Sequence, residues 1–287
     1  MDAVKEAFQT VQEYIATKFN RFAQYPYLLG HCNVCGNDVA FFTESKAMYR
    51  ELLKCSECCA TCRYRTIAKG FLRAVDELAG IKADSIAELG EFSPEKCLNV
   101  YDTQPAFYFD NLAYPLPDML NRVPWIKVEC SRFDPTVALG TRFDRSTTNQ
   151  DLECLTFPDA SFDVVITTDV MEHVRLADRA HKEIRRVLKS GGDGIYLFTV
   201  PIIRTRYESE IRVEIVDPDD PAKDIIHQLE YHGDKNSAEG RALTYRSYGS
   251  GIDDELKELG FDVSYEAYTI PELGLMQTDL FYCRLKS

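Results

Sequence analysis

The 287-residue sequence has no apolar run long enough to cross a lipid bilayer, so it predicts no membrane span. Its first residues, MDAVKEAFQTVQEYIATKF, lack the basic-then-apolar pattern of a secretion signal. Basic side chains are outnumbered, with 33 Lys and Arg against 46 Asp and Glu and a formal net charge of −13. This charge repels phosphates and argues against non-specific binding to nucleic acid. We therefore expect a cytoplasmic protein.

The same N-terminal stretch predicts an amphipathic helix, because its apolar residues recur at helical spacing. That face consists of Val4, Phe8, Val11, Ile15, Phe19 and Phe22. The opposite face mixes charges of both signs, which favours packing on the protein over binding to a membrane surface.

Cysteine, in contrast, is abundant, with ten residues. Without a secretion signal the reducing cytosol disfavours disulfides, so clustered cysteines indicate metal binding. Six of the ten lie between Cys32 and Cys62. The other four lie in or beside predicted strands, where cysteine behaves as a small apolar core residue. They are Cys97, Cys130, Cys154 and Cys283.

Two CxxC pairs carry the metal prediction. Cys32 and Cys35 are followed by Gly36, which relieves the tight turn between two ligands, and Cys55 and Cys58 repeat the spacing. Four thiolates suit a closed, tetrahedral and structural zinc site.

The second pair leaves an alternative open, because Cys59 or Cys62 could replace one of its members. His31 could also ligate, but we expect it to be a bystander. A helix and a zinc module this small need the metal to hold together. We place this module at residues 1–65.

An unbroken strand–helix–strand pattern follows later in the chain. Residues 162–168, FDVVITT, are apolar and β-branched, as in a buried parallel strand. Apolar residues at helical spacing predict a helix over 172–188, which ends at two glycines. Residues 194–201, GIYLFTVP, form the second strand. Such a βαβ unit implies a parallel sheet with a right-handed crossover.

The remaining elements complete a second domain at 66–287. We expect a helix over 66–78, strands at 98–101 and 125–130, a helix over 252–259 and two closing strands at 261–268 and 278–285. A long polar segment, 202–249, separates a strand from a helix. Excursions of that length usually have a function, so we expect a cap over a binding site.

The residues of this unit resemble those of class I S-adenosylmethionine-dependent methyltransferases of the type 11 branch. The resemblance rests on DLxxLxFxDxSFDxVxxxxVxEHV from Asp151, followed by RRVLKSGG and a strand ending in VP. A zinc-knuckle subgroup also pairs two CxxC motifs with a YHG segment, here Tyr231 to Gly233. The resemblance implies a Rossmann-like α/β sheet with helices on both faces, plus the zinc module.

The resemblance also implies where the cofactor binds. Members usually carry a glycine-rich turn after the first strand, whereas this chain has Tyr101, Asp102, Thr103 and Gln104 there, with no glycine. These polar groups can meet the amine and carboxylate of S-adenosylmethionine. The glycine-free loop equally suits a protein that has lost its cofactor site.

The other cofactor contacts come from the ends of later strands. Glu129 is the candidate acid for the ribose hydroxyls, although Arg132 is the alternative alignment and could not accept them. Asp151 would accept from the adenine amino group, unless it only caps a turn, and Leu152 would pack on the ring. Thr168 and Asp169 end the fourth strand at the ligand-binding edge.

Methyl transfer requires alignment and desolvation, and a base only when the nucleophile is protonated. His173 and His232 are the candidate catalytic bases, although a helix-start and a surface-loop histidine are also common structural features. We expect a methyltransferase whose acceptor is a small molecule, such as a sugar, glycan or secondary metabolite. The alternatives are an enzyme that uses the cofactor without transferring methyl, and a non-catalytic binding protein on a degenerate fold.

Overall fold

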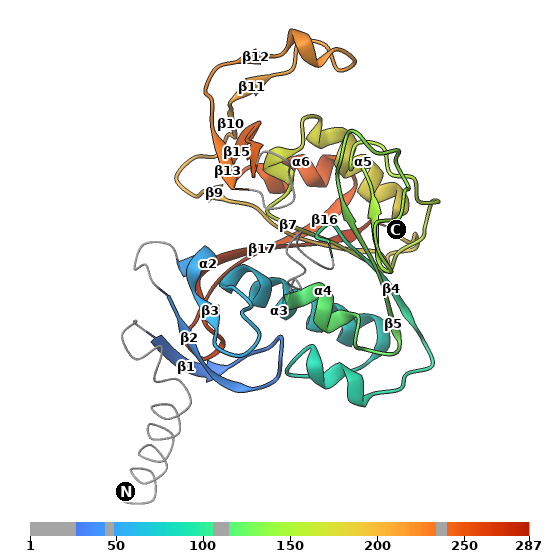
Figure 1. Ribbon diagram of the computed structural model, residues 1–287, viewed down its shortest axis with the longest axis vertical. Coiled ribbons are helices and arrows are strands. Elements are labelled where there is room, and N and C mark those ends of the chain that lie inside the picture. Colours follow the sequence, from blue (N-terminus) through green and yellow to red (C-terminus); the bar gives the residue numbers. More distant parts are fainter. Residues whose placement is uncertain (1–26, 44–48, 106–114, 234–239, 287) are drawn as a thin grey trace, which may run out of the picture.

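The computed structural model describes residues 27–43, 49–105, 115–233 and 240–286 (Figure 1). The helix predicted near the N-terminus lies outside these ranges.

The centre of the molecule is a mixed β-sheet. Within the described residues its seven strands run in the order β16-β17-β8-β7-β4-β5-β6. Strands β6, β5, β4, β7 and β8 are parallel neighbours, while β17 is antiparallel to both β8 and β16. Their bounds are β4 Leu98–Asp102, β5 Ile126–Arg132, β6 Thr147–Asn149, β7 Val164–Thr168, β8 Ile195–Thr199, β16 Phe261–Ile270 and β17 Leu275–Leu285. This is the Rossmann-like α/β sheet that the sequence predicted, including its closing antiparallel hairpin.

Helices cover both faces of the sheet, as Figure 1 shows. Because side chains alternate along a strand, Ile195 and Leu197 join the core on one side and Tyr196 and Phe198 the core on the other. The first core is covered by α3 (Cys62–Ala79) and α4 (Pro115–Leu120), and the second by α5 (Ala177–Val187) and α6 (Ile252–Glu258). No helix in the described ranges has the length and apolar character to cross a membrane.

The helix expected over 172–188 begins later than the sequence pattern indicated. Residues Met171–His173 form the short 3-10 turn η3, and α5 starts only at Ala177. The backbone between them has partners outside the helix. The carbonyl oxygen of Glu172 accepts from the N–H of Tyr245, and the N–H of Leu176 donates to the carboxylate of Glu153. Conversely, α3 begins at Cys62, four residues before the predicted start.

Two of the four cysteines expected in the core are not there. Cys130 and Cys283 are buried, but Cys97 and Cys154 are exposed. Cys97 precedes β4 at the amino edge of the sheet, and Cys154 lies in the turn after β6. Because both lie outside the strands, the sheet does not bury their side chains.

The N-terminal module is a small antiparallel sheet of β1 (Tyr27–His31), β2 (Asp38–Phe42) and β3 (Lys54–Cys55), with α2 (Tyr49–Leu52) between the last two. It shares the core beneath α3 with the large sheet. Fully buried Arg65 joins the two parts. Its guanidinium lies 4.3 Å from the Phe41 ring centroid and donates to the carbonyl oxygens of Leu53, Ala60, Leu273 and Gly274.

The polar segment 202–249 consists of short strands. They are β9 Ile202–Ile203, β10 Glu210–Ile211, β11 Val213–Glu214, β12 Ile225–Ile226, β13 Tyr231–Gly233, β14 Arg241–Leu243 and β15 Arg246–Gly249. The pair β11–β12, with the 3-10 turn η4 (Pro221–Lys223), extends away from the body of the molecule (Figure 1). The pair β13–β14 lies closer to the sheet. Two further 3-10 turns, η2 (Ala87–Glu91) and η5 (Pro271–Leu273), connect other elements.

Buried His181 on α5 should make stability depend on pH. Burial lowers the pKa of His181 to about 3, so the histidine is neutral when folded and takes up a proton on unfolding below its ordinary pKa of about 6.5. This stability is present above pH 6.5 and is lost as the pH falls towards 3, by up to about 1.4 kcal/mol per pH unit. In urea titrations, the free energy of unfolding of His181→Phe should therefore rise relative to that of the wild type as the pH falls from 6.5 to 5. Parallel curves for the two proteins would contradict this.

Candidate functional site

The carboxyl ends of the parallel strands bring together residues far apart in the sequence. Strands β5, β4, β7 and β8 end at Arg132, Asp102, Thr168 and Thr199 respectively. Because neighbouring parallel strands point the same way, these ends lie along one edge of the sheet. Open α/β sheets bind their ligands at this edge.

The glycine-free loop after β4 is tied to the end of β7. Thr103 donates its backbone N–H to Ile166, and the Gln104 amide nitrogen donates to the carbonyl oxygen of Thr168 at 2.9 Å. Asp102 Oδ1 accepts from the backbone of Gln104, while Oδ2 is buried with no hydrogen-bond partner among the described residues. Burial raises the pKa of Asp102 to about 7. The loop thus holds an under-satisfied carboxyl group at the edge.

Two predicted cofactor residues have side chains directed elsewhere. The Tyr101 ring is fully buried against Phe162, and its hydroxyl bonds Ser131. Glu129 lies three residues before the end of β5 and pairs with Arg142 at 2.8 Å. It lines a cleft of about 370 Å³ together with Gln150, Phe162 and other residues.

Arg132, the alternative alignment for the ribose-binding acid, stands at the end of β5. Its guanidinium lies 3.8 Å from the ring centroid of Phe143. After β6, Asp151 Oδ1 accepts from the backbone N–H of Glu153, as in a turn, and Leu152 is buried in the core. Asp151 thus follows the carboxyl end of β6 and is engaged in a local turn through one oxygen.

Asp169 is the most heavily engaged acid of the site. It adopts a positive φ of 51°, which is uncommon for a residue with a side chain, and accepts from Thr199 Oγ1 at 2.8 Å. Both of its carboxylate oxygens pair with Arg50 of α2, and Oδ2 also accepts from Arg63 of α3 at 2.9 Å. Burial opposes ionisation, but Arg50 and Arg63 hold the pKa of the carboxyl well below its usual range. The N-terminal module thus reaches into the edge of the sheet.

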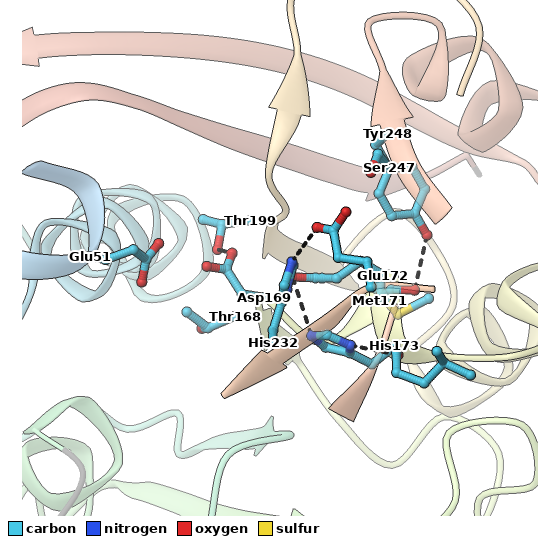
Figure 2. Close-up of polar contacts among 12 residues, drawn as sticks. Glu51, Thr168, Asp169, Met171, Glu172, His173, Thr199, His232, Ser247 and Tyr248 are labelled. Atoms are coloured by element: carbon cyan, nitrogen blue, oxygen red, sulfur yellow. Dashed lines mark hydrogen bonds and ion pairs between the residues drawn. The ribbon is translucent and has the colours of Figure 1, made fainter. Parts of the chain in front are cut away.

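A second cluster lies just beyond Asp169. Figure 2 shows Glu172 and His173 from η3 together with His232 from β13. The two imidazole rings are 4.9 Å apart, edge to face, and a ring nitrogen of each lies 3.8–3.9 Å from Glu172 Oε1. Burial, together with the charge of Asp169, raises the pKa of Glu172 to about 8. The structure therefore brings the two predicted catalytic histidines together.

The four cysteines of the CxxC pairs also converge. The sulfur atoms of Cys32 and Cys58 are 3.8 Å apart, and those of Cys35 and Cys55 are 3.9 Å apart. Thiolates bound tetrahedrally to zinc at about 2.3 Å lie about 3.8 Å from one another, so the four sulfurs fit this ion. Gly36 adopts a positive φ of 73° at the end of the first turn, as its position predicted.

The alternative ligands lie outside this group. Cys59 is exposed, the sulfur of Cys62 contacts the backbone of Met276, and His31 pairs with Asp38 at 3.1 Å. Within the described residues, Cys55 and Cys58 rather than Cys59 or Cys62 therefore lie beside the first pair.

Three residues of the edge were missed in the sequence. Arg50 and Arg63 flank the second cysteine pair, and no local pattern links them to Asp169, more than 100 positions away. Glu172 has a signal in the sequence, because it precedes His173 within the VxEHV segment, but the helical spacing predicts it as the start of a helix. Its burial beside two histidines became visible only in three dimensions.

Comparison with known proteins gives a family match for part of the chain. Residues 134–196 match a family described as a methyltransferase domain. This methyltransferase-domain match runs from the loop after β5 into β8 and includes Asp151, Asp169 and His173. It includes neither the loop after β4 nor segment 202–249. Among curated proteins, no sequence matches the chain.

Several solved structures resemble this chain at low identity. An S-adenosylmethionine-dependent methyltransferase from Mesorhizobium loti is 18% identical over 70% of this chain and 98% of its own, with a TM-score of 0.39. One from Aquifex aeolicus is 13% identical over 78% and 98%, with a TM-score of 0.39. The cyclase SpnF is 15% identical over 77% and 82%, with a TM-score of 0.42.

Proposed function

We propose that this protein is an S-adenosylmethionine-dependent methyltransferase that acts on a small molecule. The observation that carries the proposal is the methyltransferase-domain match over residues 134–196. The strand order and the antiparallel β17 support it, because they build the sheet expected of that family.

The residues at the edge of the sheet fit the cofactor. S-adenosylmethionine supplies a methyl group activated on a sulfonium. Asp102, Thr103 and Gln104 would hold its methionine end, and Asp151 and Leu152 its adenine. The buried, unpartnered Oδ2 of Asp102 supports this assignment, because an ammonium group would supply the missing donor and favour the charged carboxylate.

The acceptor would lie beside the ends of β7 and β8, near Thr168 and Asp169. A displacement at a sulfonium carbon needs an aligned nucleophile and little water. If the acceptor carries a proton, the cluster of Glu172, His173 and His232 is placed to receive it. The part of segment 202–249 that contributes His232 would cover this side of the site.

The four-cysteine group would hold a structural zinc ion. All four protein ligands come from Cys32, Cys35, Cys55 and Cys58, so no coordination position is left for a substrate. The ion would fix the short module that carries Arg50 and Arg63 against the sheet.

A second candidate is a binding protein on a degenerate methyltransferase fold. One observation favours it, because Arg132 occupies the end of β5, where a carboxylate would accept both ribose hydroxyls. Calorimetry with S-adenosylmethionine and S-adenosylhomocysteine distinguishes the two. We expect both ligands to bind, and the absence of binding would favour the second candidate. Mass spectrometry of the products of a candidate-acceptor mixture then tests for methyl transfer.

Replacing Asp151 by alanine tests the adenine position. We expect Asp151→Ala to weaken binding of S-adenosylhomocysteine by about 1–3 kcal/mol, because a hydrogen-bond acceptor is lost. The matched control is Asp159→Ala, an exposed acid of the next loop that pairs with Arg186. Calorimetric affinity equal to that of the wild type in Asp151→Ala would mean that the adenine lies elsewhere.

A further inference from the structure

Glu172 is an acid without an adequate partner. Its side chain is 2% exposed, and neither carboxylate oxygen has a hydrogen-bond partner among the described residues. Buried polar groups in folded proteins are almost always satisfied, so a carboxyl group left with two bare oxygens needs an explanation. The rings of His173 and His232 lie beside its Oε1, and the charges of Asp169, Arg50 and Arg63 also act on it.

Both histidines are oriented by a hydrogen bond on the far side of the ring. His173 Nδ1 lies 2.8 Å from the carbonyl oxygen of Leu243, and His232 Nε2 lies 3.1 Å from Glu230 Oε1. A carbonyl and a carboxylate can only accept, so these two nitrogens carry the protons. The other nitrogens, His173 Nε2 and His232 Nδ1, therefore present lone pairs on the side of Glu172.

We propose that Glu172, His173 and His232 form a divalent-cation site at the carboxyl end of β7. One donor atom from each residue lies within 4.8 Å of the others. Ligands held about 2.1 Å from one ion lie about 3–4 Å apart, so a small inward rotation of the side chains completes the set. Donation of the second ring nitrogen to a carbonyl or carboxylate is the usual arrangement for histidines that bind metal.

The donor set selects the class of ion. Two imidazoles and one carboxylate suit Mn²⁺, Fe²⁺, Co²⁺ or Zn²⁺, whereas the four thiolates of the N-terminal module suit softer metal ions. Three protein ligands leave open coordination positions, and His232 is 35% exposed, which gives the ion a path from solvent. Resting on the proposed function, an acceptor oxygen would fill one such position, where the ion would lower its pKa. Its proton would then leave to water, because the ion would occupy the nitrogens that otherwise receive it.

Manganese binding to the full, zinc-loaded chain tests the site, because Mn²⁺ has little affinity for thiolates. We expect one Mn²⁺ per chain in an electron paramagnetic resonance titration without cofactor. Glu172→Gln and His232→Ala should each weaken binding at least tenfold. The matched control is His227→Ala, an exposed histidine of the same segment that pairs with Glu214, and its affinity should equal that of the wild type.

The outcomes are decisive either way. If neither Mn²⁺ nor Co²⁺ binds outside the cysteine site, or if His232→Ala binds as tightly as His227→Ala, the proposal is overturned. His232 lies on a short surface strand, so its variant remains informative even if Glu172→Gln does not fold. Because no cofactor is present, failure here leaves the methyltransferase proposal standing. Loss of S-adenosylhomocysteine binding alone would in turn leave the metal site standing.

Discussion

Replacing Cys35 by serine should abolish tight zinc binding and destabilise the whole chain by about 4 kcal/mol or more. The four sulfur atoms have the spacing of a tetrahedral zinc site, and the β1–β3 sheet around them is too small to fold on apolar burial alone. Metal-binding free energy in such a module is folding free energy. Since the module shares its core with α3, its loss removes packing from the large sheet.

The measurement is elemental analysis of protein purified without chelators, combined with thermal unfolding. The wild type should carry one zinc per chain. The matched control is Cys59→Ser, an exposed thiol of the same segment that should keep both zinc and stability. Zinc-free wild-type protein of full stability would show that the four cysteines have another purpose.

Replacing Asp169 by alanine should destabilise the protein by about 3–5 kcal/mol, the usual result of removing one partner from a buried ion pair. Among the described residues, Arg50 and Arg63 would keep the partly exposed Glu51 as their ion-pair partner. The loss would also separate the N-terminal module from the carboxyl edge of the sheet, because these two arginines make that contact.

Urea unfolding at several pH values measures this effect. The pKa of Asp169 is lowered on folding, so its contribution is complete well above pH 4 and is lost as the pH falls. The difference between wild type and Asp169→Ala should therefore shrink as the pH falls below about 4. The control, Asp159→Ala, removes an exposed pair and should cost less than about 1 kcal/mol. Equal losses in the two variants would mean that the arginines do not depend on Asp169.

The cysteine group and the ion pairs of Asp169 are mechanically connected. Arg50 lies just before the second cysteine pair and Arg63 just after it, so an ion bound there would hold both guanidinium groups in place. Zinc removal should for this reason weaken the site at the end of β7 as well as the module itself. A cofactor titration of the zinc-depleted protein, carried out below its unfolding temperature, would reveal this coupling.

Local patterns in the sequence determined most of the elements. Alternating and continuous apolar runs predicted β4, β5, β7, β8 and the closing hairpin, because a strand or a helix buries side chains at its own period. The CxxC spacing predicted the cysteine group, because two intervening residues allow both thiolates to bind the same ion. The order of these elements along the chain then limited the fold to a doubly wound sheet.

Tertiary structure alone decided what meets at the edge of that sheet. His173 and His232 were each visible as a histidine, but their edge-to-face contact and their shared neighbour Glu172 depend on how segment 202–249 folds back. Arg50 and Arg63 reach Asp169 across 119 and 106 positions of sequence. The late start of α5 has the same origin, since the backbone N–H of Tyr245 donates to the carbonyl oxygen of Glu172. Periodicity and spacing act over a few residues, whereas ion pairs and hydrogen bonds between distant segments form only once the sheet has brought those segments together.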